Sequence, residues 1–171
     1  MMHSQDILIL LKLSTGVEAG PWLQQDLARD LGLSPAEVHK ALARAAAAGL
    51  YQAKQRKVMR GPLLEFLVHG LKYVFPARLG GPSRGVPTAW AAPVLADQVV
   101  SNEADRPVWP HGEGNARGPS VSPLYETAPD AALRDPKLYE LLALVDAIRL
   151  GGARDRKLAA DALQKNLEQT P

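Results

Sequence analysis

Hydrophobic residues recur with the period of an α-helix at both ends of the chain, and this pattern is lost between the two ends. Near the start, periodic apolar positions and, in the first segment, an apolar run of five residues predict four helices. These segments cover 6–13, 22–31, 35–48 and 62–74. Ser4 is the expected cap of the first of them. The sequence therefore predicts a mainly α-helical protein.

The helix expected over 35–48 has the clearest boundary signals in the chain. Ser34 can cap it, Pro35 takes the first helical position, and Glu37 completes a capping box with Ser34. Gly49 can adopt the left-handed conformation that ends a helix, and Gly32 can do the same for the helix before it. The two helices are thus predicted to be joined by a very short turn.

The chain divides into three segments by composition. Residues 1–75 are periodic and helical, residues 76–136 contain ten of the fourteen prolines, and residues 137–171 are helical again. Asp135 and Pro136 can begin the last segment, which is predicted to form a pair of helices separated by Gly151 and Gly152. This helix pair needs a partner surface, in the same chain or in a second copy.

Recurrent proline in residues 76–136 argues against a long helix or a central strand. Apolar residues such as Trp90, Val99 and Trp109 favour an irregular arm that packs on the helices. One or two helical turns are expected near 92–100 and a flexible stretch near 111–122. A wholly disordered linker is the alternative.

The two helices that meet at Gly32 have the features of a helix-turn-helix. Such a motif needs a short turn, small residues where the helices cross, and a polar face left free on the second helix. Ala28 permits the close crossing and Gly32 permits the turn. The shared core is predicted to consist of Leu27, Leu31, Leu33, Val38 and Leu42. The open face is left with Ser34, Ala36, His39, Lys40, Ala43 and Arg44.

The next residues, "LYQAKQRKVMR", predict two short strands around a basic tip. Together with the helix-turn-helix residues Gln24, Leu27, Ala28, Leu31, Gly32, Leu33, Ser34, Val38 and Ala41, this stretch resembles the winged helix-turn-helix of bacterial transcription regulators, of the MarR-like and related kinds. The resemblance covers about residues 5–75. It implies a winged helix-turn-helix domain over 1–75, followed by an irregular proline- and glycine-rich arm and a C-terminal helical hairpin.

The resemblance also implies which residues contact DNA. Ser34 and the start of its helix would meet a phosphate, with Ala36 on the same open face. His39 and Lys40 would reach base edges, and Arg44 would lie against the backbone. The wing would grip the neighbouring backbone or minor groove with Lys54, Arg56, Lys57 and Arg60. The open face is rich in alanine, so direct base reading is expected to be sparse.

The distribution of charge agrees with a nucleic-acid partner. Residues 1–75 carry nine Lys and Arg against six Asp and Glu, whereas the remainder carries eleven against twelve. There is no cysteine and no apolar run of about 20 residues, so a cytoplasmic protein without a membrane span is expected.

No catalytic or metal-binding pattern is evident. His3, His39, His69 and His111 are scattered without metal-ligand spacing, and "LGGPSRG" lacks the lysine of a phosphate-binding loop. The protein is therefore expected to be non-enzymatic, with neither cofactor nor metal.

Three functions remain open on the sequence. The first is a sequence-specific transcription regulator, a repressor that binds double-stranded DNA as a homodimer. Its dimer surface would be formed by the fourth helix and the final helix pair. The second is a protein-interaction module or antitoxin-like adaptor, in which the proline-rich arm wraps a partner. The third is an accessory subunit that binds nucleic acid by charge alone.

Overall fold

The computed structural model describes residues 1–171, and the side chains of all of them except Glu103. The first half comprises α1 (Ser4–Leu13), α2 (Gln24–Leu31), α3 (Pro35–Ala47), β1 (Tyr51–Gln52), β2 (Lys57–Val58), α4 (Arg60–His69) and α5 (Leu71–Val74), with a 3-10 turn at Val17–Ala19. The second half comprises β3 (Leu79–Pro87), α6 (Pro93–Ala96), β4 (Val108–Pro110), β5 (Ala116–Val121), α7 (Ala128–Arg134), α8 (Pro136–Leu150) and α9 (Ala153–Gln169), with 3-10 turns at Ala89–Ala91 and Glu103–Asp105. The mainly helical fold class is confirmed.

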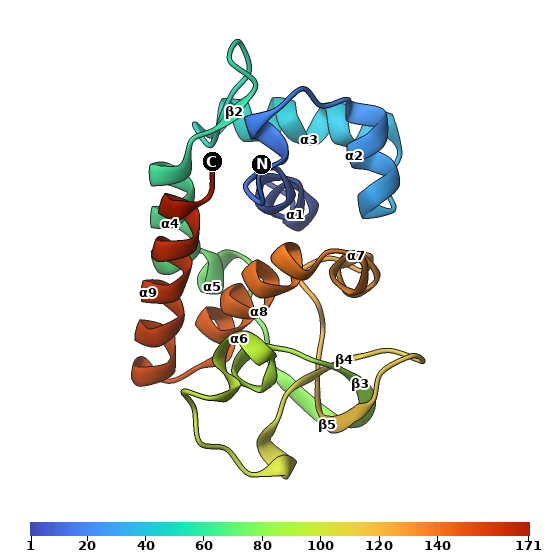
Figure 1. The fold of residues 1–171 in the computed structure, drawn as a ribbon, viewed down its shortest axis with the longest axis vertical. Helices are drawn as coiled ribbons and strands as arrows, with labels where there is room; N and C mark the ends of the chain where they lie inside the picture. The colour runs from blue at the N-terminus through green and yellow to red at the C-terminus, as the bar shows by residue number, and fades with distance from the viewer.

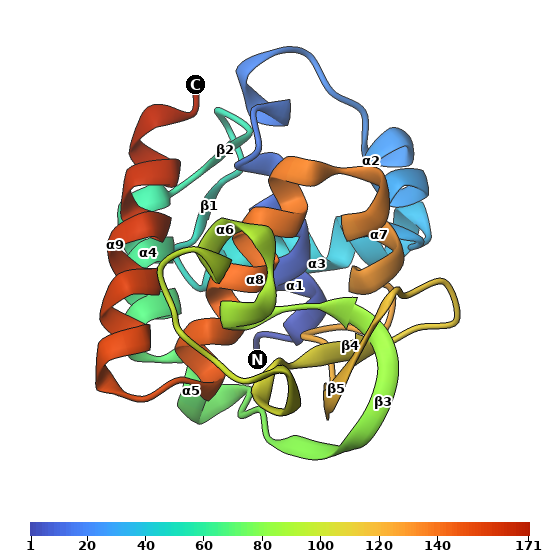
Figure 2. The same ribbon diagram turned by 60° about the horizontal axis from the view of Figure 1, so that its bottom comes forward.

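The elements lie in layers along the long axis of the molecule. Figure 1 shows α2, α3 and the β1–β2 hairpin at one end and the strands β3, β4 and β5 at the other. Between these ends lie α1 and then α8, while α4 and α9 run along one side. Figure 2 shows α8 between α9 and α7, above the strands of the second half.

The local signals around the third helix are confirmed in detail. The Ser34 hydroxyl accepts a hydrogen bond from the Glu37 N–H at 3.1 Å, and the Glu37 carboxylate accepts one from the Ser34 N–H at 2.7 Å. Gly32 and Gly49 are left-handed, with φ of 68° and 78°, and they end α2 and α3. A side chain would strain these positions, so glycine makes both turns possible.

Three helix boundaries differ from expectation. His3, not Ser4, precedes α1, and the Asp6 carboxylate accepts from the His3 N–H at 2.8 Å. α2 begins at Gln24 rather than at residue 22. The helix expected over 62–74 is two helices, α4 and α5, which meet at Gly70.

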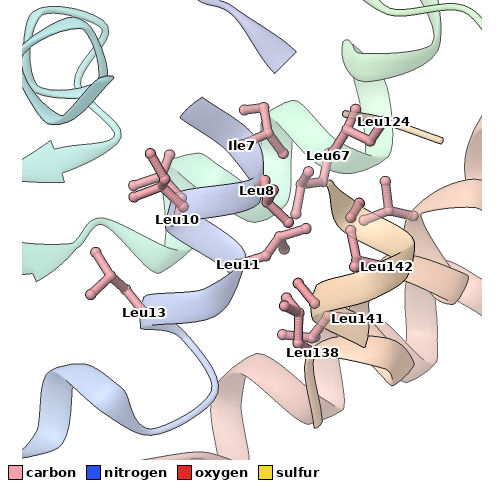
Figure 3. Packing of buried hydrophobic residues seen from close by; sticks show 14 of the residues in the cluster. Ile7, Leu8, Leu10, Leu11, Leu13, Leu67, Leu124, Leu138, Leu141 and Leu142 are labelled. Carbon is pink, nitrogen blue, oxygen red and sulfur yellow. The ribbon is translucent and has the colours of Figure 1, made fainter. Parts of the chain in front are cut away.

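α1 lies at the centre of the hydrophobic core. Its residues from Ile7 to Leu11, and Leu13, have no solvent exposure. Figure 3 shows Leu8 and Leu11 pointing toward side chains of α4 and α8, while Leu10 and Leu13 point to the other side. At the end of the helix, the Lys12 ammonium pairs with Asp135 at 2.7 Å, and Asp135 also caps α8. One core therefore joins α1, α2 and α3 to the C-terminal helices.

Residues 76–136 form a small sheet and two short helices, α6 and α7, so the expectation that they could contain no central strand is wrong. β3 pairs antiparallel with both β4 and β5. Residue pairs in an antiparallel ladder alternate between hydrogen-bonded and non-hydrogen-bonded positions. Thr88 and Pro107 form a hydrogen-bonded pair, because the Thr88 N–H donates to the Pro107 carbonyl at 2.9 Å. The neighbouring pair, Pro87 with Val108, is then a non-bonded one. Proline is tolerated there because the pairing does not need its missing N–H.

The stretch over 111–122, expected to be flexible, contains β5. β5 leads into α7, which the sequence did not reveal. The expected helical turn near 92–100 is confirmed as α6. A wholly disordered linker is excluded.

A buried polar cluster fixes the small sheet to α8. The Asp146 carboxylate accepts hydrogen bonds from the Thr88 hydroxyl at 2.6 Å and the Trp109 indole at 2.7 Å, and it pairs with Arg149 at 2.9 Å. Arg149 also donates to the Phe75 carbonyl at 2.9 Å. Burial raises the pKa of Asp146, while Arg149 and the two neutral donors oppose that shift.

The C-terminal helix pair is confirmed, and its partner surface lies in the same chain. α8 is buried over most of its length, and α9 packs on α8 and α4 through Ala159, Leu163 and Leu167.

Replacing Asp146 tests whether this cluster holds the sheet in place. Asp146→Asn removes the charge opposite Arg149 and turns an amide donor toward groups that already donate. We expect the free energy of unfolding to fall by about 3–5 kcal/mol, the usual cost of breaking a buried ion pair. Chemical denaturation measures this loss. The exposed Asp97→Asn is the matched control and should change stability by no more than about 0.5 kcal/mol; an equal loss in both variants would contradict the assignment.

Candidate nucleic-acid interface

The exposed face of α3 is the surface that the packing of α2 and α3 leaves open. Its buried face consists of Val38, Ala41, Leu42 and Ala45. Ala36, His39, Lys40 and Ala43 are exposed on the opposite side. The side chains of His39 and Lys40 make no hydrogen bond or ion pair with any side chain that the structure describes. Their donor groups are therefore available to a partner.

The turn before α3 is held from two sides. The Leu33 N–H donates to the Ala28 carbonyl at 2.8 Å across Gly32, which closes the end of α2. On the outer side, a Cβ at Gly32 would lie 3.3 Å from the Thr127 methyl carbon, just before α7. Arg134 of α7 donates to the Asp30 carbonyl at 2.9 Å. The second half of the chain thus supports the geometry of the turn.

The amino end of α3 already carries a negative charge. Hydrogen bonds from Ser34 lower the pKa of the Glu37 carboxyl, which keeps Glu37 ionised at neutral pH. This carboxylate occupies the positive end of the helix dipole, where the sequence predicted a phosphate. Ser34 is exposed, but a phosphate beside it would meet the charge of Glu37.

Arg44 lies on the inner side of α3, against α1. Its guanidinium forms two parallel hydrogen bonds with the Asp6 carboxylate, at 2.9 and 2.7 Å. Asp6 has no solvent exposure, and the Arg44 side chain is 21% exposed. The bonds to Asp6 raise the pKa of Arg44. Arg44 therefore orients α3 on α1, a role that the sequence did not reveal.

The two short strands expected around the basic tip are confirmed as an antiparallel hairpin, with Tyr51 paired to Val58 and Gln52 to Lys57. This hairpin stands where the sequence predicts a wing, and it is called the wing below. Lys54 is exposed at its tip. Arg56 has a positive φ of 55° and lies over the Trp22 ring, 4.0 Å from the ring centroid. Its guanidinium also donates to the Trp22 carbonyl at 2.9 Å. This contact holds the wing against the segment between α1 and α2.

Glu18, in that same segment, fixes the base of the wing. Its carboxylate accepts from the Val58 N–H at 2.6 Å, and its carbonyl accepts from the Lys57 ammonium. Arg60 pairs with the Glu18 carboxylate at 2.9 Å. Arg60 is the first residue of α4 rather than part of the wing, and it also donates to the Leu167 and Pro171 carbonyls.

The predicted contact residues thus fall into two groups. One group is exposed: Ser34, whose hydroxyl caps α3, and Ala36, His39, Lys40 and Lys54. The other has side chains engaged within the chain: Arg44 and Arg60 in ion pairs, and the exposed Arg56 on Trp22 and Lys57 on Glu18. The partners Asp6, Glu18 and Trp22 are far away in sequence. Of these three partners, only Asp6 stands out in the sequence, as an acid in the first turn of α1. The helix dipole alone is enough to explain an acid at that position.

Comparison of the chain with family models, with curated proteins and with solved structures returns no match. Among the described residues, none of the helices combines the length and apolar character needed to span a bilayer. Within the same residues, no three His, Asp or Glu side chains gather in a way that could hold a metal ion.

Two substitutions one helical turn apart test whether Arg44 of α3 is structural and Lys40 is not. Arg44→Ala leaves the buried Asp6 carboxylate without its partner, so we expect about 3–5 kcal/mol of stability to be lost. Lys40→Ala removes an exposed side chain, and we expect the unfolding free energy to stay within about 0.5 kcal/mol of the parent. Urea denaturation compares the two. A stable Arg44→Ala protein would show that the Asp6 contact is dispensable.

Proposed function

We propose that the protein is a non-enzymatic transcription regulator that binds double-stranded DNA through the exposed face of α3 and the tip of the wing. The observation that carries this proposal is the pair His39 and Lys40, which project from a helix-turn-helix without an intramolecular partner among the described side chains. A helix presented in this way can enter the major groove of DNA. Lys54 supports it with an exposed charge on the wing.

The proposed contacts are few, which determines the mode of binding. Lys40 is the residue best suited to a guanine edge, and His39 can donate to a purine acceptor. Ala36 and Ala43 allow the helix to approach the base pairs closely. Four of the predicted cations, all assigned to the backbone or minor groove, are engaged within the chain, so phosphate contacts are few and the shape of the groove adds to what His39 and Lys40 supply.

A repressor of this kind would act as a homodimer on a palindromic site, with the two α3 helices about 34 Å apart. Most of α8 and the inner face of α9 are covered by their own chain. The proposed dimer surface is therefore the outer side of α4. An apolar groove there is lined by Met2, Leu50, Pro62 and Phe66, among others.

A protein-interaction role, such as that of an antitoxin-like adaptor, is the second candidate. The observation that favours it is the small, alanine-rich face of α3, whose neighbouring arginine is committed to α1. The two functions differ in whether the chain selects a DNA sequence, and this difference can be measured directly.

Selection of duplexes from a random library, followed by fluorescence anisotropy at two salt concentrations, tests the proposal. We expect enrichment of one sequence and a dissociation constant that rises with salt, with the modest slope that a few phosphate contacts give. Equal affinity for all duplexes would favour an accessory protein that binds by charge alone. No retention at low salt would contradict DNA binding and favour the adaptor.

The two exposed lysines should affect binding in different ways. Lys40→Ala should lower the preference for the selected sequence by about 1–3 kcal/mol. Lys54→Ala should weaken binding to all duplexes equally and reduce the slope of log K against log salt by about 0.9. Lys165→Ala, an exposed residue of α9, is the control and should change neither quantity. Identical effects of Lys40→Ala and Lys165→Ala would remove α3 from the interface.

A further inference from the structure

The small sheet at the opposite end from α3 brings two arginines face to face. Arg84 of β3 and Arg117 of β5 are directly opposed in the antiparallel register, so their side chains leave the same face of the sheet. Like charges in this position destabilise a strand pair. Arg84 is fixed there, because its Nε–H donates to the Gly114 carbonyl at 2.7 Å.

A third arginine, Arg106, lies against β5, the strand that contains Arg117. A Cβ at Gly118 would lie only 1.9 Å from the Arg106 carbonyl oxygen, so the backbones of Arg106 and β5 are in direct contact. This approach, possible only with glycine at 118, places Arg106 beside Arg117. Both arginines are exposed. No carboxylate among the described side chains lies within 4 Å of either guanidinium.

Arg106 and Arg117 line one hollow of about 370 Å³, together with Pro87, Ala91, Val108, Asn115 and Ala116. The size of this hollow is at the lower end for small-molecule sites. Two guanidinium groups offer planar sets of N–H donors, which suit the oxygens of a phosphate or a similar oxyanion. The Asn115 amide can add a further hydrogen bond.

We infer that this hollow is a binding site for a small phosphate-bearing ligand, held by Arg106, Arg117 and Asn115. A bound dianion compensates the repulsion between Arg117 and Arg84. On the proposed function DNA lies against α3 and the wing, and the strands of this site lie at the far end of the molecule (Figure 1), so the ligand is a small molecule rather than that nucleic-acid backbone.

Thermal unfolding in phosphate-free buffer, with inorganic phosphate added at constant ionic strength, tests the site. At a tenfold excess of phosphate over its dissociation constant, we expect the melting temperature of the full chain to rise by about 3–6 °C. The double variant Arg106→Gln and Arg117→Gln should lose this rise. Arg154→Gln on α9 and Lys54→Ala on the wing are exposed controls that should keep it. Absence of the shift in the parent, or an equal shift in the double variant, would overturn the inference.

Two further measurements separate a ligand site from a structural role of these arginines and from a nucleic-acid contact. In phosphate-free buffer, Arg117→Gln should melt at the same or a higher temperature than the parent, because it removes the repulsion with Arg84; a lower temperature would mean that Arg117 is structural.

The affinity of the double variant for duplex DNA should equal that of the parent, since a small ligand is proposed. A fall in that affinity would assign these arginines to a nucleic-acid backbone and contradict the small-ligand site.

Discussion

The structure depends on the complete burial of α1. A helix that is apolar on all sides is stable only when other elements cover its whole surface. In this protein α3 covers one side of α1, and α8 covers another. The two charged residues of α1 reinforce this arrangement, since Asp6 binds Arg44 of α3 and Lys12 binds the residue that caps α8. The orientation of α3 is thereby tied, through α1, to the C-terminal helices.

This arrangement explains why the candidate interface is smaller than its positive charge suggests. Several cations near α3 make contacts within the chain. Arg44 pairs with Asp6 of α1, Arg60 binds Glu18 and the end of α9, and Arg56 packs on Trp22. They make the helix and the wing rigid, and they leave His39, Lys40 and Lys54 to face a partner. Rigid presentation of a few side chains lowers the entropic cost of binding, because no ordering of the surface is required.

Local features of the fold could be predicted from the sequence, and contacts between distant residues could not. The capping box at Ser34, the turn at Gly32 and the start of α8 depend on neighbouring residues, so their signals are readable along the chain. The pairing of β3 with β4 and β5 depends on register across long loops, and proline concealed it. The ion pair of Arg44 joins residues 38 positions apart, and exposed and paired arginines look the same in a sequence. The exposed residues of α3 followed from its amphipathic pattern, whereas the internal roles of Arg44 and Arg60 required the fold.

Residues 1–75 share their core with the C-terminal helices, although the sequence alone suggests a separate winged domain there. Circular dichroism and hydrogen exchange on the isolated fragment 1–75, beside the full chain, test this most directly. Because the fragment exposes the side of α1 that α8 covers, we predict no cooperative unfolding transition and little amide protection in α1. A fragment that unfolds cooperatively, with α1 amides protected as strongly as in the full chain, would contradict the claim of a shared core.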